Sequence, residues 1–143
     1  MTNITPGMVC AHHHLYSSLA RGMPAPQGKT DSFISILENI WWRIDAALDL
    51  DMIYWSAALG AAEALASGTT CIIDHHESPH AIEGSLATIA KACRDVGVRV
   101  NACYGVTDRW DNDGKLHNHV DASTKMTTGA RRGLDEGLAF IKS

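Results

Sequence analysis

The stretch "TTCIIDHH", residues 69–76, decides the fold, because it reads as a buried β-strand with polar residues at its end. It is rich in β-branched and apolar residues, which favour strands. The next segment, 84–96, places Leu86, Ile89 and Cys93 on one helical stripe and stops at Gly97. "VRVNACYGV", residues 98–106, then predicts a second strand. This is a strand, a helix and a strand in succession.

The same alternation extends upstream. An apolar run, 8–11, leads into three histidines, and a loop with Gly and Pro residues covers 17–31. Helical spacing predicts helices over 33–44 and 51–66, with Gly68 as a stop. A weaker helical pattern ends the chain. We therefore predict an α/β fold with parallel strands near 8–13, 70–75 and 98–104, side by side in that order, with helices on one face.

Composition excludes several classes of protein. Of 143 residues, 45% are hydrophobic and 20% are charged, as in a globular domain. The net charge of −4 and the lack of a basic run argue against nucleic-acid binding. No apolar run reaches the ~18 residues of a membrane span, and no signal peptide is evident. Four scattered cysteines predict buried, reduced thiols and a cytoplasmic protein.

Polar residues gather where each predicted strand ends. His12, His13 and His14 follow the first strand; Asp74, His75 and His76 end the second; Thr107 and Asp108 follow the third. The carboxyl ends of parallel strands share one edge, and ligands bind at that edge in α/β sheets. Five histidines at the ends of two neighbouring strands form the strongest functional signal.

The spacing of the first three histidines suggests a metal site. Residues i and i+2 of a strand point to the same side, so His12 and His14 should face one way and His13 the other. Two neutral imidazoles on one side of a strand can share a zinc or iron ion. The alternative is that these are polar loop residues. His117 and His119 have the same spacing, but they lie in a polar stretch and are read as loop.

The local sequence resembles the amidohydrolase superfamily. "PGMVCAHHHLYS" is similar to its first-strand signature, and "SGTTCIIDHHESPHAIEGSL" and "GVRVNACYGVTDR" are similar to the following strands. Across residues 5–110, the chain is most similar to SsnA-type aminohydrolases and to the subgroup of triazine chlorohydrolases and 8-oxoguanine deaminases. The family fold is a TIM barrel, and three βα units are about three of its eight.

The resemblance implies a divalent metal, zinc or alternatively iron, with His12 and His14 as ligands. Tyr16 matches an aromatic residue that lines the pocket. In this reading, residues 1–143 form a partial barrel domain without the flanking β-sandwich, the later strands or the general acid/base, which is expected beyond residue 143. Such a partial barrel has open sheet edges, so self-association is expected.

The roles of His75 and His76 stay open at this point. Alternation allows only one of them to face the way His12 and His14 do. That one is a pocket candidate or a partner of a metal-bound imidazole, whereas the alternative for both is a hydrogen-bonded polar pair at a strand end. Asp74 can cap or orient a neighbour. Trp41, Trp42 and Trp55 are expected to pack against the sheet, with Trp42 off the main stripe.

Two functions are therefore predicted. The first is the N-terminal portion of an aminohydrolase or deaminase that uses metal-activated hydroxide on a C–N bond of a small nitrogen heterocycle. The second is a non-catalytic fragment with at most weak metal binding. A catalytic zinc site needs about three protein ligands, and His12 and His14 supply two.

Overall fold

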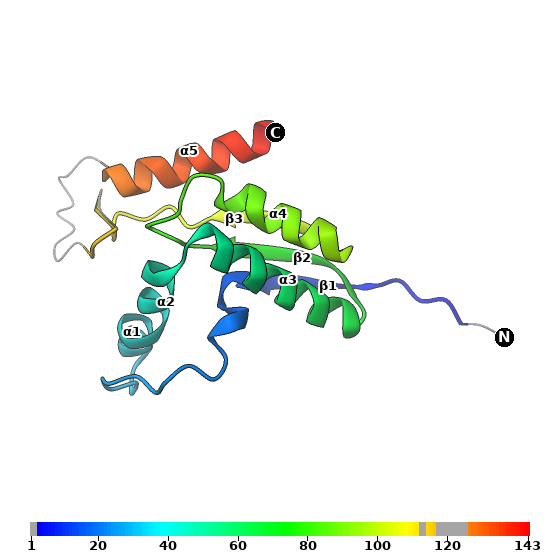
Figure 1. The fold of residues 1–143 in the computed structure, drawn as a ribbon, viewed down its shortest axis with the longest axis horizontal. Coiled ribbons are helices and arrows are strands. Elements are labelled where there is room, and N and C mark those ends of the chain that lie inside the picture. The colour runs from blue at the N-terminus through cyan, green and yellow to red at the C-terminus, as the bar shows by residue number, and fades with distance from the viewer. Residues whose placement is uncertain (1–2, 112–113, 117–125) are drawn as a thin grey trace.

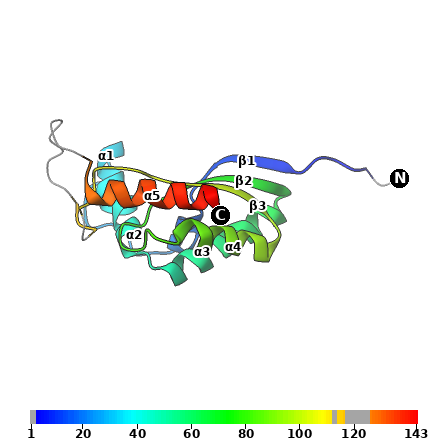
Figure 2. The same cartoon turned by 90° about the horizontal axis from the view of Figure 1, so that it is seen from above.

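The computed structural model describes residues 3–111, 114–116 and 126–143. Its centre is a parallel sheet of β1 (Met8–His13), β2 (Thr69–His76) and β3 (Arg99–Tyr104), in the order β1-β2-β3 (Figure 1). This confirms the predicted strands, their order and their direction. The helices α3 (Leu50–Ala66) and α4 (Ser85–Val96) lie on the same face of the sheet (Figure 2). His117 and His119 lie outside the described residues.

The long helices have clear sequence boundaries. The side chain of Asp49 accepts a hydrogen bond from the Met52 N–H at 2.7 Å and so caps α3. Helix α4 ends at Gly97, whose φ of 99° is the left-handed conformation that glycine adopts easily. Helix α5 (Thr128–Lys142) begins at Thr127, whose side chain accepts the Ala130 N–H at 3.1 Å, and it packs against α4 and β3.

The helix predicted over 33–44 is divided into three. A capped turn, α1 (Phe33–Ile36), leads into a π-helical segment, η2 (Leu37–Trp41), and then into α2 (Trp42–Ala47). Ser32 is the N-cap and forms a capping box with Ser35. A π-helical turn is wider than an α-helical turn, so it changes the direction of the side chains that follow.

The pairing of β1 with β2 is irregular just before the histidines. Cys10 pairs with Ile72 and His13 pairs with Asp74, so β1 advances three residues while β2 advances two. One extra residue on one strand is a β-bulge. The pairing of β2 with β3 is regular from Cys71–Arg99 to His76–Tyr104.

The core lies between the sheet and its helices. It is built from fully buried residues of the 3-10 helix η1 (Leu15–Ala20), of α3, of β2 and of α4: Leu15, Ile53, Ala57, Ile72, Leu86, Ile89 and Cys93. The other face of the sheet is open, with Val9 61% exposed and Ile73 41% exposed. β1 and β3 form the outer edges of the sheet.

Two packing expectations are corrected. Trp55 is 59% exposed and does not pack against the sheet, because it lies on the outer side of α3. All four cysteines are free thiols, but only Cys93 is buried; Cys10 and Cys71 are half-buried and Cys103 is exposed. In the described parts of the chain, no helix is both long enough and apolar enough to cross a bilayer.

Candidate metal centre

His12 and His14 lie together at the end of β1. Their Nε2 atoms are 3.1 Å apart and their ring centroids 4.9 Å apart. Two imidazole nitrogens that bind one tetrahedral zinc at about 2.0–2.1 Å are about 3.3 Å apart. The pair therefore has a spacing that suits one shared ion, and the predicted same-side placement of His12 and His14 is confirmed.

His13 belongs to the opposite side of the strand. Its backbone pairs with that of Asp74, whose side chain is fully buried on the helix side of the sheet. Burial lowers the pKa of His13, while the carboxylate of Glu63 on α3 raises it in part. Because paired residues of parallel strands share a face, the pairing with Asp74 places His13 on the helix side of the sheet, away from the pair.

The protonation of His14 follows from its contact with β2. Its Nδ1 is 3.0 Å from the His75 carbonyl oxygen, and a carbonyl oxygen can only accept. Nδ1 therefore carries the proton, and the Nε2 lone pair points toward His12. Burial lowers the pKa of His14 below the usual value for histidine, which favours the neutral ring that binds metals.

The structure separates His75 from His76. The His75 ring is 5.4 Å from the His14 ring, so His75 shares the open face with the pair. His76 is fully buried on the helix side, where its Nε2 is 2.8 Å from the Ser78 hydroxyl oxygen. Burial lowers the pKa of His76 to about 3, so this ring is neutral. Of these two histidines, only His75 therefore lies beside His14.

Aromatic side chains surround His14. Tyr16 is 5% exposed, and its ring lies 5.7 Å from that of His14 and 5.3 Å from that of His76. Trp41, the last residue of η2, lies 5.4 Å from the His14 ring. Trp41 was expected only to pack against the sheet. It lies beside His14 because it ends the π-helical segment η2, and the sequence pattern predicted no such segment.

A group of charged residues behind Tyr16 was also missed. Asp45 is 2% exposed and interacts with the Tyr16 hydroxyl group; burial and then the nearby Glu77 carboxylate raise its pKa to about 7. Glu77, in the loop that follows β2, is 8% exposed and accepts hydrogen bonds from Arg109 at 3.1 Å and Trp110 at 3.3 Å. The Arg109 guanidinium stacks on Trp42, 4.6 Å from the ring centroid. An acidic residue inside an apolar helical stripe, as Asp45 is, was the available signal.

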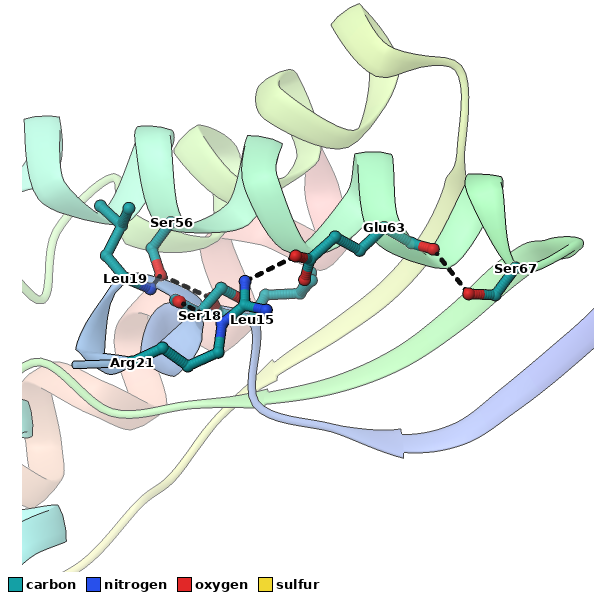
Figure 3. A network of polar contacts seen from close by, with 7 residues as sticks. All are labelled: Leu15, Ser18, Leu19, Arg21, Ser56, Glu63 and Ser67. Carbon is teal, nitrogen blue, oxygen red and sulfur yellow. Dashed lines mark hydrogen bonds and ion pairs between the residues drawn. The ribbon is translucent and has the colours of Figure 1, made fainter.

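Leu15, the residue after His14, has both its N–H and its carbonyl group hydrogen-bonded to buried side chains. Its N–H donates to Asp74 Oδ1 at 2.7 Å, and its carbonyl accepts from the Ser56 hydroxyl group at 2.8 Å. Ser56 also accepts the Leu19 N–H at 3.2 Å, so one hydroxyl group joins α3 to both ends of η1 (Figure 3). Arg21, which follows η1, adds an ion pair at 2.6 Å with Glu63 of α3 (Figure 3).

Comparisons with known proteins identify the family of the chain. The model of the amidohydrolase family matches residues 3–140. The chain belongs to the amidohydrolase family. A 5-methylthioadenosine/S-adenosylhomocysteine deaminase of Thermococcus sibiricus is 31% identical over 110 residues, which are 77% of this chain and 23% of that protein. A 5'-deoxyadenosine deaminase of Methanocaldococcus jannaschii is 32% identical over 108 residues, 76% of this chain and 23% of that protein.

Solved structures with a similar fold include a zinc-containing hydrolase. Atrazine chlorohydrolase TrzN from Arthrobacter aurescens TC1, complexed with zinc, matches with a TM-score of 0.71 and 22% identity. The match covers 96% of this chain and 30% of that one. This amidohydrolase chain thus has the fold of part of a larger enzyme, and it spans about a quarter of the length of the curated relatives it matches.

The ligand count of this amidohydrolase chain is incomplete within the described ranges. Across 3–111, 114–116 and 126–143, no three His, Cys, Asp or Glu side chains are grouped so that they can hold a metal ion. His12 and His14 therefore fit two positions of a metal site, and the described residues offer no third.

Proposed function

We propose that the chain is the N-terminal portion of the barrel of a metal-dependent amidohydrolase, with His12 and His14 as two of the metal ligands. The observation that carries this proposal is the 3.1 Å separation of the two Nε2 atoms at the carboxyl end of β1. This edge is the catalytic face of (β/α) barrels. Zinc is the proposed metal, with iron as the alternative, because both accept imidazole ligands.

The residues of the chain have separate tasks in this proposal. When bound, the metal supplies Lewis-acid chemistry that activates water for hydrolysis of a C–N bond. His14 is held in the tautomer whose Nε2 lone pair faces the ion, because its Nδ1–H donates to the His75 carbonyl oxygen. Tyr16 and Trp41 enclose the His14 ring and limit the water around it.

The proposed substrate is a small nitrogen heterocycle. Two relatives are named as deaminases of adenosine derivatives, and deamination of such a ring breaks a C–N bond. His75 lies beside His14 on the open face and is the proposed pocket residue together with Tyr16. His76 is proposed to pack, because it is buried and bonded to Ser78.

The remaining ligands and the general acid/base are proposed to come from further barrel strands. Residues 1–143 then act as a partial barrel domain, inactive alone and prone to self-association through the outer edges of β1 and β3. A cytoplasmic location suits the four free thiols. The second candidate is a non-catalytic fragment with weak metal binding. It is favoured because the described ranges hold no third ligand beside His12 and His14.

Zinc binding by the purified chain tests the proposed site. Isothermal titration should detect a weak zinc site that disappears in His12→Ala and in His14→Ala. His13→Ala is the matched control, since His13 faces the helices, and it should bind zinc as the original chain does. Equal zinc binding by all four proteins would refute the assignment of the ligands.

Ammonia release separates the two candidates. The 143-residue chain should release no ammonia from purines, pyrimidines or triazines with added zinc or iron, whereas a longer protein that contains it should do so. Loss of that activity in His14→Ala, with the fold retained by circular dichroism, would support the amidohydrolase. An inactive longer protein that still binds zinc would support the non-catalytic alternative.

A further inference from the structure

Leu15 is fully buried, and its position in the chain makes its anchoring important. It follows His14 directly, at the point where β1 has ended and η1 begins. His14 itself is outside both elements, with φ −133° and ψ 77°. As the N-cap of η1, His14 accepts the Ser17 N–H at 3.1 Å and the Ser17 hydroxyl group at 2.8 Å on its carbonyl oxygen, and contacts of Leu15 hold the peptide that follows.

Two buried side chains supply these contacts from different elements. Asp74 of β2 accepts the Leu15 N–H at 2.7 Å, and Ser56 of α3 donates to the Leu15 carbonyl oxygen at 2.8 Å. Both Asp74 and Ser56 are 0% exposed. A buried polar group is costly unless it is paired, so these two bonds strongly favour one conformation of the Leu15 peptide.

We propose that Asp74 and Ser56 form a clamp on Leu15 that positions the imidazole of His14. They are positioning residues, because neither lies against the Nε2 atoms of the pair. With the backbone of Leu15 fixed from the sheet and from α3, the preceding His14 can reach the His75 carbonyl oxygen at 3.0 Å. That bond in turn selects the Nδ1–H tautomer. The inference rests on the proposed metal site for its consequence, though not for its geometry.

The clamp makes a prediction that needs no metal. In imidazole ¹⁵N–¹H correlation spectra of the metal-free chain, His14 should be almost entirely the Nδ1–H tautomer. Asp74→Leu and Ser56→Ala should each convert His14 to a mixture of tautomers, because the Leu15 peptide is then free to turn. Asp74→Asn keeps an acceptor oxygen at the same place, so it should retain the tautomer of the original chain.

Matched controls separate positioning from stability. Glu136 is a buried carboxylate that accepts the N–H groups of Gly84 at 2.9 Å and Leu86 at 3.1 Å, far from the pair in sequence and on α5. Glu136→Leu and Thr127→Ala, which removes the N-cap of α5, should lower the free energy of unfolding and leave the His14 tautomer unchanged. If Asp74→Leu does not fold, the comparison of Ser56→Ala with Thr127→Ala decides.

Zinc titration of the same samples adds the functional consequence. The dissociation constant for zinc, read from the shifts of His12 and His14, should rise about tenfold or more in Asp74→Leu and Ser56→Ala and stay unchanged in Asp74→Asn and the controls. An unchanged tautomer in both clamp variants would overturn the clamp, whatever zinc does. A lack of zinc response in the original chain would instead overturn the proposed metal site, while the tautomers still decide the clamp.

Discussion

The Nδ1 atom of His14 lies 3.0 Å from the carbonyl oxygen of His75, so the backbone of β2 sets the tautomer of a side chain that follows β1. Because this leaves a lone pair on Nε2 of His14, the Nε2 of His12 must be the donor in the 3.1 Å contact between the two rings. Without metal, the pair thus shares a hydrogen atom at the place where an ion would be bound.

Zinc should therefore change His12 and leave the tautomer of His14 as it is. We expect the ¹⁵N shifts of metal-free His12 to report an Nε2–H ring, and added zinc to replace that proton and move it to Nδ1. The His14 Nδ1–H signal should persist through the titration. A zinc-dependent loss of the Nδ1–H of His14 would contradict the assigned geometry.

The buried Asp45 should make stability depend on pH. Its pKa in the folded chain is raised to about 7 by burial and then by Glu77, above the ~4 of an unfolded chain. The folded state therefore binds the proton more tightly, and stability present below pH ~4 is lost as the pH rises to about 7. Asp45→Asn should remove this part of the pH dependence. Urea unfolding at several pH values measures it, and parallel curves for both proteins would contradict the prediction.

Gly60 allows α3 to approach η1 closely. A Cβ atom there would lie 2.5 Å from Ser18 Oγ and 2.8 Å from Leu15 Cδ2. Gly60→Ala should therefore lower the free energy of unfolding by about 1–3 kcal/mol. Gly137→Ala is the control, since no atom lies within 4 Å of its Cβ, and it should stabilise α5 by about 0.5–1 kcal/mol. Thermal unfolding of both variants checks the opposite signs.

Cys93 should report on opening of the core. It is 0% exposed, and burial raises the pKa of its thiol to about 12, so little thiolate is available. Alkylation with iodoacetamide, followed by mass spectrometry, should be slowest at Cys93 and should accelerate with urea along the unfolding curve. Cys103, which is exposed, serves as the internal reference. Equal rates at both cysteines in water would show that the core is already open.

The sequence predicted the sheet well because its strands are separated by helices with clear stops. Gly97 is an example, since its left-handed conformation ends α4 where the pattern places it. The same-side placement of His12 and His14 followed from a local rule on neighbouring residues. The places of Trp41 beside His14 and of Asp45 beside Tyr16 could not be predicted from such a local rule, because they depend on the path of η2 and α2 across the ends of the strands. Helical periodicity predicts which residues share one face of a helix. It does not predict a π-helical turn, which changes the direction of the side chains that follow it.

The bulge in β1 decides which histidines can act together. Strict alternation from Cys10, which packs into the core, would turn His12 and His14 toward the helices and leave His13 on the open face. The extra residue between Cys10 and His13 reverses that parity at the cost of one unpaired position. The strand can thus anchor a thiol in the core and still present the outer two of three consecutive histidines. Deletion of Ala11 would therefore remove the bulge without moving the pair, because Cys10 and His13 would then be separated by one residue, as Ile72 and Asp74 are, and His12 and His14 would keep the open face.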